Sequence, residues 1–333
     1  MRALFDLCSG FVYSQVLLAC TRLGLFDRIA EQPKTAPELA GELALPRESL
    51  DVLLQAAESL KLIEARGRDR FGLGPLGAAL RGNPGVAMMI EHHARLYADL
   101  SDPLALLRGE IETTRLQRFW AYSASDRPSR LETAQIGDYT ELMAASQEMI
   151  ADQVLSAYPV HRHRRLLDVG GGSGRFALAA LRRSATLHAE VFDLPPVALR
   201  ARERFRASGC GERAGATGGD FLHDPLPSGF DLVTLVRIVH DQNDEAALQL
   251  LRAIRRAIAP GGVLLIAEPM LGTRGAEPAA AAYFGFYLLA MGQGRPRSRA
   301  TIAGLLRQAG FGGVRMHRTT APLLARVLTA RPE

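Results

Sequence analysis

The stretch LLDVGGGSGRF, Leu166 to Phe176, decides the fold of the second half of the chain. It joins an apolar run that ends in an acidic residue to a glycine-rich turn, and helix-forming residues follow. Glycine adopts positive φ angles and lets another group approach the backbone closely. The stretch therefore predicts a strand, a tight turn against which a ligand can lie, and a helix that begins near Phe176.

A glycine turn of this kind has more than one use. Dinucleotide-binding enzymes have a similar turn with the spacing GxGxxG, whereas Gly170, Gly172 and Gly174 fit GxGxG. From the glycine turn alone, a dehydrogenase-like enzyme remains an alternative. The residues that follow it decide the kind of ligand.

Apolar runs alternate with helical stretches through the rest of this half. The predicted strands are RRLLDVG, AEVFDL, ATGGDF, FDLVTLVRI and VLLIAEP. Such alternation is typical of an α/β fold with a doubly wound, mostly parallel sheet, in which ligands bind beyond the carboxyl ends of the strands. Four acidic residues lie at or near these ends, which predicts a ligand site there: Asp168, Asp193, Asp220 and Glu268.

The acidic residue after the second strand indicates a ribose. Asp193 follows the glycines by about twenty residues, where a carboxylate can accept both ribose hydroxyls. A helix cap before Pro195 is the alternative role. The segment GGDF ends the third strand, where Asp220 suits an adenine edge and Phe221 the face of the ring. We therefore expect an adenosine-containing ligand.

The first hundred residues predict a small helical domain. Helical periodicity begins near Ser14, and Thr35 and Glu38 have the spacing of a capping box at the start of a second helix. A third helix is predicted after Pro46, and two short strands follow around Gly67. Three helices and a hairpin form a winged-helix pattern.

A winged helix often binds DNA, so a transcription regulator is a second hypothesis. The outward residues of the third helix are more acidic than basic, which does not suit a phosphate-lined groove: Glu48, Asp51, Gln55 and Glu58. Dimerisation is therefore the preferred role for this domain.

Residues 85–160 remain helical in character. The segments YADLSDPLALLRG and YTELMAASQEMIADQVLSAY show long apolar faces. Met143 and its neighbours either pack in the core or cover a cleft in the following domain, and helical spacing favours the core.

Composition places the chain among folded proteins of two domains. It has 333 residues, of which 47% are hydrophobic, and three cysteines, Cys8, Cys20 and Cys210, without metal-ligand spacing. We expect reduced thiols, no disulfide and no metal site.

The net charge of +5 comes from arginine, since lysine occurs only at Lys34 and Lys61. The one dense basic cluster is HRHRR at residues 161–165, which we interpret as the solvated start of a strand rather than a phosphate site. The most apolar stretch begins at Ala279 and is shorter than the ~20 residues that cross a bilayer. The expected location is the cytoplasm.

Several segments, in order, resemble the S-adenosylmethionine-dependent O-methyltransferases: LLDVGGGSGRF, FDLPPV, GGDFLHDPLP and RIVHDQNDE. The resemblance covers almost the whole chain. It implies a Rossmann-like class I methyltransferase domain over residues 101–333, with a helical lid at about 101–160, and a winged-helix dimerisation domain over residues 1–100. S-adenosyl-L-methionine is the implied cofactor, and a homodimer is implied.

The nearest branch includes plant phenolic and hydroxyindole O-methyltransferases. Other segments resemble the bacterial 1-hydroxycarotenoid (demethylspheroidene) O-methyltransferases more closely: LYADLSDPLALLRG, LMAASQ, AEPMLGT and YFGFYLLAMGQGRPRS. They imply a hydroxylated carotenoid as acceptor. Phenols, hydroxyindoles and polyketides remain the alternatives.

Histidine is the usual side chain for removing a hydroxyl proton. In the resembling family the histidine of the HDWSD motif is the base. His240 matches it in VHDQND, with Gln242 in place of the tryptophan. Glu268 matches the acid that orients this histidine, although a buried strand-end acid is its alternative role.

The chain departs from the plant enzymes at one place. Pro296 in GRPRS stands where their KERT-like segment has glutamate, so a single carboxylate must suffice. Arg237 resembles an arginine of the hydroxyindole branch that contacts the cofactor. Asp241 either shapes the field around the base or caps the following helix.

The residues expected to bind cofactor are Asp168, Gly170, Gly172, Gly174, Asp193, Leu194, Gly219, Asp220, Phe221 and Arg237. The expected acceptor pocket is apolar and suits a hydrophobic alcohol or phenol. Its candidate residues are Met143, Tyr283, Phe286 and Tyr287. Core packing would explain the helix that holds the last three equally well. A membrane-dissolved acceptor would require peripheral contact with the cytoplasmic membrane face.

Overall fold

The computed structural model describes residues 1–67, 69–120, 122, 142 and 147–333. The chain divides into two compact units, Met1–Ala94 and Arg95–Glu333.

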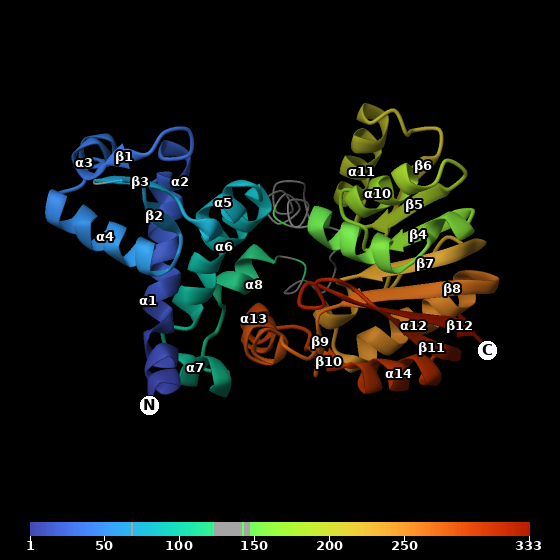
Figure 1. Ribbon diagram of the computed structural model, residues 1–333. Helices are drawn as coiled ribbons and strands as arrows, with labels where there is room; N and C mark the ends of the chain where they lie inside the picture. Colours follow the sequence, from blue (N-terminus) through green and yellow to red (C-terminus); the bar gives the residue numbers. More distant parts are fainter. Residues whose placement is uncertain (68, 121, 123–141, 143–146) are drawn as a thin grey trace. The chain divides into compact units, whose positions relative to one another are not determined.

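The first unit contains the predicted helices and hairpin (Figure 1). The capping box of Thr35 and Glu38 is present at the start of α3, as predicted. Two strands pair antiparallel after α4, with Ile63 opposite Leu73. The elements are α1 (Arg2–Arg22), α2 (Leu25–Arg28), β1 (Lys34–Thr35), α3 (Ala36–Leu43), α4 (Arg47–Ser59), β2 (Ile63–Ala65), β3 (Arg70–Leu73) and α5 (Pro75–Arg81).

Helix α1 differs from the prediction because it begins at Arg2 rather than near Ser14. Its early residues are apolar but exposed, with Phe5 at 71% and Phe11 at 70% exposure, so they lack the buried face that sequence periodicity detects. By length and composition alone, α1 is also the one helix in the described part of the chain that could cross a bilayer.

The third helix, α4, has the expected acidic outer face. Leu50 and Leu54 are buried, while Glu48 and Glu58 are exposed. Asp51 is half-buried and pairs with Arg47 one turn earlier, at 2.8 Å. The face therefore presents little free positive charge.

The second unit is built on a seven-stranded sheet with the order β11-β12-β8-β7-β4-β5-β6. The five strands from β8 to β6 are parallel, as predicted. Their bounds are β4 (Arg165–Val169), β5 (His188–Asp193), β6 (Ala214–Gly218), β7 (Phe230–Val236) and β8 (Ile258–Glu268). The antiparallel edge strands are β11 (Phe311–His317) and β12 (Arg326–Pro332).

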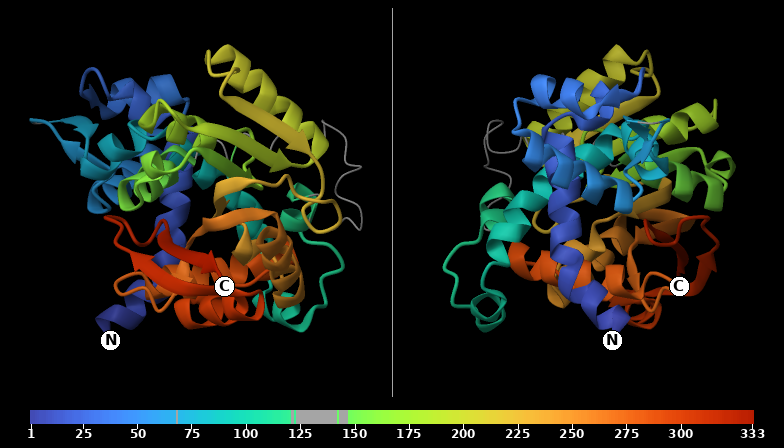
Figure 2. Two further views of the ribbon diagram at one scale, coloured as in Figure 1. Left: turned by 90° about the vertical axis from the view of Figure 1, so that its right-hand side faces the viewer. Right: turned by 60° about the vertical axis from the view of Figure 1, so that its left-hand side comes forward.

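Helices cover both faces of this sheet (Figure 1 and Figure 2). On one face lie α10 (Arg175–Arg183), α11 (Pro195–Ala207) and residues 147–157; on the other lie α12 (Asp244–Ala257) and α14 (Arg299–Gln308). Neighbouring residues of one strand, such as Leu166 and Leu167, enter opposite cores. Strands buried on both faces are apolar throughout, which is why their sequences are continuous apolar runs.

The strand order reverses between β4 and β7, because β5 and β6 follow β4 on one side while β7 and β8 lie on the other. Ligands of open α/β sheets bind at such a switch point. The glycine turn follows β4, and a short 3₁₀ turn, η4 (Val239–Asp241), follows β7. Both turns therefore lie at the carboxyl edge of this point.

The remaining elements include α6 (Pro84–Asp99), α7 (Pro103–Arg108), α8 (Arg115–Phe119) and the turn η3 (Val160–Arg162). A π-helical segment, η5 (Ala279–Tyr283), leads directly into α13 (Phe284–Met291). Two short strands, β9 (Met270–Leu271) and β10 (Arg297–Ser298), pair in parallel.

Candidate active site

The glycine turn after β4 has one open side. Gly170, Gly172 and Gly174 all have positive φ, at 68°, 58° and 78°. A Cβ at Gly170 would collide with Ile238, and one at Gly174 would lie 2.5 Å from Phe205. No atom of the described residues lies within 4 Å of the position a Cβ would take at Gly172. The turn therefore packs tightly at both ends and leaves its middle accessible to a ligand.

Asp168 lies just before this turn, and its side chain links β4 to β7 across the switch point. Its Oδ1 accepts a hydrogen bond of 2.6 Å from the Thr234 hydroxyl of β7. Its Oδ2 is buried and has no hydrogen-bond partner among the described residues. Burial raises the pKa of Asp168 to about 7, and Asp193 adds to the rise while Thr234 opposes it. A cationic ligand would favour the ionised carboxylate.

The structure brings Asp193 to the glycine turn. Its Oδ2 accepts from the N–H of Gly172 and its Oδ1 from that of Leu194, both at 2.7 Å. Burial raises the pKa of Asp193 to about 6, although both N–H groups lower it. Leu194 is the N-cap of α11 and no side chain caps that helix, so the alternative capping role of Asp193 is not observed.

Asp220 lies two residues beyond β6, in a turn of its own. Its Oδ1 accepts from the N–H of Leu222 at 2.9 Å, and its Oδ2 contacts His223 Nδ1 at 2.8 Å. Gly219 precedes it, and a Cβ there would lie 2.5 Å from the Phe192 ring. Phe221 is partly buried against the core beneath α12. The adenine contact stays a prediction.

The predicted base lies in η4 and is almost fully buried, with 6% exposure. His240 Nδ1 is hydrogen-bonded to Glu268 Oε2. The other oxygen, Oε1, accepts from the N–H groups of Ile238 and Val239 at 3.0 and 2.7 Å. Glu268 thus fixes both the backbone of the turn and the ring of His240, leaving Nε2 for proton transfer.

Asp241 lies beside the reactive nitrogen, with its Oδ1 3.1 Å from His240 Nε2. Burial alone would lower the pKa of His240, but Glu268 and Asp241 outweigh it, and the pKa is raised. Burial raises the pKa of Asp241 against the effect of His240. The hydroxyl of Tyr122 donates to Asp241 at 3.2 Å. Asn243, not Asp241, caps α12, through a 2.8 Å bond from Ala246 N–H.

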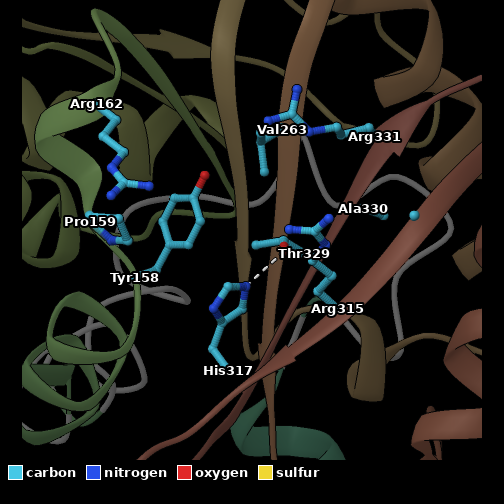
Figure 3. A pocket seen from close by; sticks show the side chains of 10 residues that line it. Tyr158, Pro159, Arg162, Val263, Arg315, His317, Thr329, Ala330 and Arg331 are labelled. Carbon is cyan, nitrogen blue, oxygen red and sulfur yellow. Dashed lines mark hydrogen bonds between the residues drawn. The ribbon is translucent and has the colours of Figure 1, made fainter.

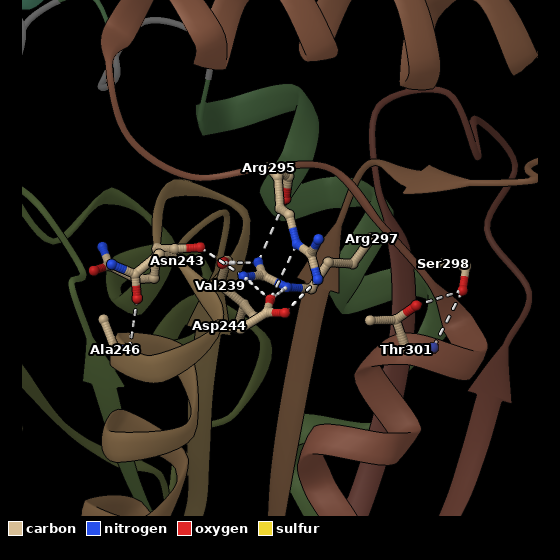
Figure 4. Close-up of polar contacts among 9 residues, drawn as sticks. Val239, Asn243, Asp244, Ala246, Arg295, Arg297, Ser298 and Thr301 are labelled. Carbon is tan, nitrogen blue, oxygen red and sulfur yellow. Dashed lines mark hydrogen bonds and ion pairs between the residues drawn. The ribbon is translucent and has the colours of Figure 1, made fainter.

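Arg297 holds the turn that contains His240 through backbone carbonyls of that turn (Figure 4). Its guanidinium is buried, with 3% residue exposure, and donates to the carbonyls of Val239 and Gln242, both at 2.7 Å. It also donates to Asp244 at 2.7 and 2.9 Å. Pairing of β10 with β9, two residues after Glu268, brings Arg297 to this place.

Gly294 lies in the segment that connects α13 to Arg297. It has φ of 84°, and a Cβ there would collide with the carbonyl of His240. The N–H of Arg295 donates to the same carbonyl at 2.8 Å. The sequence did not predict a role for Arg297, because no local sequence pattern marks this arginine as buried. Within this segment, only the neighbouring Pro296 departs visibly from the family pattern.

Arg237 has an unusual backbone conformation for its residue type, with φ of 60°. Its N–H donates to Ala267 of the adjacent strand at 2.8 Å. Its charge acts to lower the pKa values of His240, Asp241 and Tyr283. Left-handed backbone at a residue with a side chain costs roughly 1–3 kcal/mol and is concentrated at functional sites.

The acceptor candidates of η5 and α13 pack with α8. Tyr287 is buried, and Trp120 Nε1 donates to its hydroxyl at 2.9 Å. Tyr283 and Phe286 are half-buried in the same cluster. Burial raises the pKa of Tyr283 to about 12, so it stays neutral. Phe284, which sequence reasoning missed, lies edge-on to His240 with ring centres 6.0 Å apart. Met143 lies outside the described residues.

A buried histidine–carboxylate pair beside a glycine turn, at the switch point of a parallel sheet, defines a nucleotide-type α/β enzyme that performs base-assisted chemistry. The O-methyltransferase domain family matches residues 97–312, and the O-methyltransferase dimerisation domain family matches residues 5–81. The chain belongs to the O-methyltransferase family. It is an enzyme that uses S-adenosylmethionine.

Relatives match over nearly the whole chain. Demethylspheroidene O-methyltransferase of Cereibacter sphaeroides is 40% identical over 329 residues, covering 98% of this chain and 86% of that protein. Acetylserotonin O-methyltransferase of Mus musculus is 32% identical, covering 96% and 86%. The crystal structure of human N-acetylserotonin methyltransferase in complex with SAM superposes with a TM-score of 0.80 at 25% identity, covering 99% and 97%.

Proposed function

We propose that the acceptor is a hydrophobic alcohol, specifically a 1-hydroxycarotenoid, and that the enzyme acts in carotenoid biosynthesis. The observation that carries this proposal is the 40% identity to a demethylspheroidene O-methyltransferase over 98% of the chain. Identity to the acetylserotonin enzyme, which acts on a hydroxyindole, is lower at 32%.

The helix that carries the acceptor candidates supports this choice. Helix α13 has the sequence FGFYLLAM and contains no charged residue. Tyr283, Phe286 and Tyr287, with Met143 from the sequence prediction, would contact the acceptor. An uncharged, largely aromatic surface favours an acceptor without anionic groups.

The cofactor would lie along the turn after β4. The open side of Gly172 and the unpartnered Asp168 Oδ2 fit a cationic ligand there. We expect Asp193 to bind the ribose and Arg237 to contact the cofactor near the base. The remaining proposed cofactor residues are Gly170, Gly174, Leu194, Gly219, Asp220 and Phe221.

When bound, S-adenosylmethionine supplies an electrophilic methyl group. The chain's own task is to hold the acceptor oxygen in line and to take its proton. His240 Nε2 accepts that proton, while Glu268 holds Nδ1 and stabilises the resulting imidazolium. A tertiary alcohol is much less acidic than a phenol, so its proton leaves late, while the new bond is already forming.

The domain arrangement predicted from the sequence is part of the proposal. Residues 1–100 would pair two chains, and residues 101–160 would form a helical lid on the catalytic domain, which spans 101–333. The enzyme would be cytoplasmic and would touch the membrane face peripherally, because a polyene acceptor dissolves in the bilayer.

A phenol, hydroxyindole or polyketide is the alternative acceptor. The acetylserotonin enzyme and a 3-hydroxy-5-methyl-1-naphthoate 3-O-methyltransferase, 31% identical to this chain, favour it. Both have aromatic hydroxyl acceptors.

One experiment separates these acceptors. The purified protein is incubated with labelled S-adenosylmethionine and a 1-hydroxycarotenoid in detergent, and separately with a panel of phenols and hydroxyindoles. Mass spectrometry then identifies the product. We expect a methyl ether of the carotenoid; methylation confined to the phenols would refute the carotenoid acceptor and leave the O-methyltransferase activity intact.

A further inference from the structure

The basic cluster at residues 161–165 contributes to a cavity that the active site does not use (Figure 3). The cavity has a volume of about 580 Å³. Tyr158 and Arg162 form one wall, and β8, β11 and β12 form the other. It lies over the antiparallel edge of the sheet, whereas the candidate active site lies at the switch point between β4 and β7.

Three arginines from three segments line this cavity: Arg162, Arg315 and Arg331. No aspartate or glutamate in the described part of the chain lines it. Among the described residues, none of the three arginines forms an ion pair with a carboxylate. Arg331 donates to the carbonyl of Gly261 at 3.2 Å. The cavity therefore concentrates positive charge.

Burial raises the pKa of Tyr158, Arg331 and Arg162 oppose the rise, and the nearby carboxylate of Asp231 adds to it. This carboxylate already accepts from the N–H groups of Arg164 and Arg165, at 3.0 and 2.8 Å. His163 lies 3.6 Å from it. Asp231 is thus engaged at the start of β4 and does not line the cavity.

The other polar groups have fixed partners. Tyr158 pairs through its hydroxyl with His163 Nε2 at 2.8 Å, and His317 Nε2 pairs with the Thr329 hydroxyl at 2.8 Å. Burial, and then Arg315, lower the pKa of His317. His317 therefore carries less positive charge near neutral pH than an ordinary histidine does.

We propose that this cavity binds a phosphate group. The guanidinium group presents several N–H donors in a planar fork that matches phosphate oxygens, and it keeps its charge at any physiological pH. The three exposed arginines line one cavity in which no described carboxylate neutralises them, and a phosphate anion would supply that counter-charge. A free phosphate monoester and the headgroup of an anionic phospholipid share this chemistry.

Two probes distinguish these sources. Glycerol 3-phosphate tests the free ester, and vesicles of phosphatidylglycerol, compared with phosphatidylcholine, test the headgroup. Binding of the ester should raise the pKa of His317 in a proton NMR titration, because a nearby anion stabilises the imidazolium. Binding of vesicles should carry the protein upward in a flotation gradient.

The variant Arg162→Gln/Arg315→Gln/Arg331→Gln removes the proposed donors. Its control is Arg252→Gln/Arg256→Gln/Arg307→Gln, which removes the same charge from exposed helix positions outside the cavity. We expect the cavity variant to bind the effective probe at least about tenfold more weakly and the control to bind it as the parent does.

Circular dichroism confirms folding of both variants, and the single variant Arg315→Gln repeats the test with a smaller change. Binding of the ester alone assigns a soluble ligand, and binding of phosphatidylglycerol vesicles alone assigns a headgroup. The proposal is overturned if neither probe binds, or if the control variant loses as much binding as the cavity variant.

Discussion

His240 has a carboxylate at each ring nitrogen, and this arrangement determines how it can act as a base. Glu268 holds Nδ1, while Asp241 lies 3.1 Å from Nε2. The acceptor hydroxyl would therefore meet Nε2 beside the carboxylate of Asp241. The hydroxyl of Tyr122 donates a hydrogen bond of 3.2 Å to the other oxygen of that carboxylate and helps to hold it in place.

Replacing the base should separate catalysis from binding. We expect His240→Ala to lower methyl transfer by roughly 10²- to 10⁴-fold, the usual contribution of a positioned acid or base, with cofactor affinity nearly unchanged. Arg237→Ala should do the reverse, since its charge lies near the predicted cofactor site. Isothermal calorimetry and turnover rates measure the two effects, and full turnover by His240→Ala would show that positioning alone drives the reaction.

The pH dependence of kcat/KM should show the effect of Glu268 on the pKa of His240. The proposed base is neutral His240, so we expect kcat/KM to rise as pH increases through its raised pKa. In Glu268→Gln the buried negative charge is lost, so the pKa of His240 falls and the acidic limb moves to lower pH. The maximal rate falls as well, because the imidazolium is less stabilised. An acidic limb at the same pH in both proteins would contradict this assignment.

At the scale of elements, the position of η4 depends on the pairing of β9 with β10. That pairing delivers Arg297 to the carbonyls on both sides of His240. A displacement of about 1 Å in a catalytic group can cost on the order of 10² in rate. Arg297 is therefore a positioning residue for the base.

We expect Arg297→Met to lower kcat by about 10- to 100-fold while KM for the cofactor changes little, and Arg297→Lys to restore part of the loss. Arg295→Gln is the matched control, because Arg295 also pairs with Asp244 but is exposed, and exposed pairs contribute ~0–1 kcal/mol. Steady-state kinetics, with circular dichroism to confirm folding, measure these changes. Equal losses in kcat for Arg297→Met and Arg295→Gln would remove the positioning role.

Local sequence patterns predicted most helices and strands. The features that were not predicted depend on tertiary packing. The capping box at Thr35 and the apolar run before Gly170 depend on neighbouring residues, so the sequence alone located α3 and β4. The early turns of α1 were missed because their apolar residues stay exposed. The role of Arg297 depends on a strand pair that joins segments almost thirty residues apart, which no local pattern contains.

At the scale of the whole molecule, the first unit should pair two chains and bind no DNA. Its match to a dimerisation domain and the acidic outer face of α4 support this expectation. Light scattering should give twice the mass of the 36.1 kDa chain. A mobility shift at low salt should show no complex with DNA; tight, salt-sensitive and sequence-selective retention would revive the regulator hypothesis.

Helix α13, which carries the acceptor candidates, is separate in the chain from the residues that hold the turn of His240. This separation affects how acceptor preference can change during evolution. Helix α13 ends at Met291, and Gly294 and Arg297 fasten the following segment to the turn that contains His240. Side chains on α13 other than Phe284, whose ring lies edge-on to His240, can therefore be exchanged during evolution while the proton-accepting residues keep their geometry. Within one such lineage, new acceptors can arise by substitutions in a single helix, without passing through an inactive ancestor.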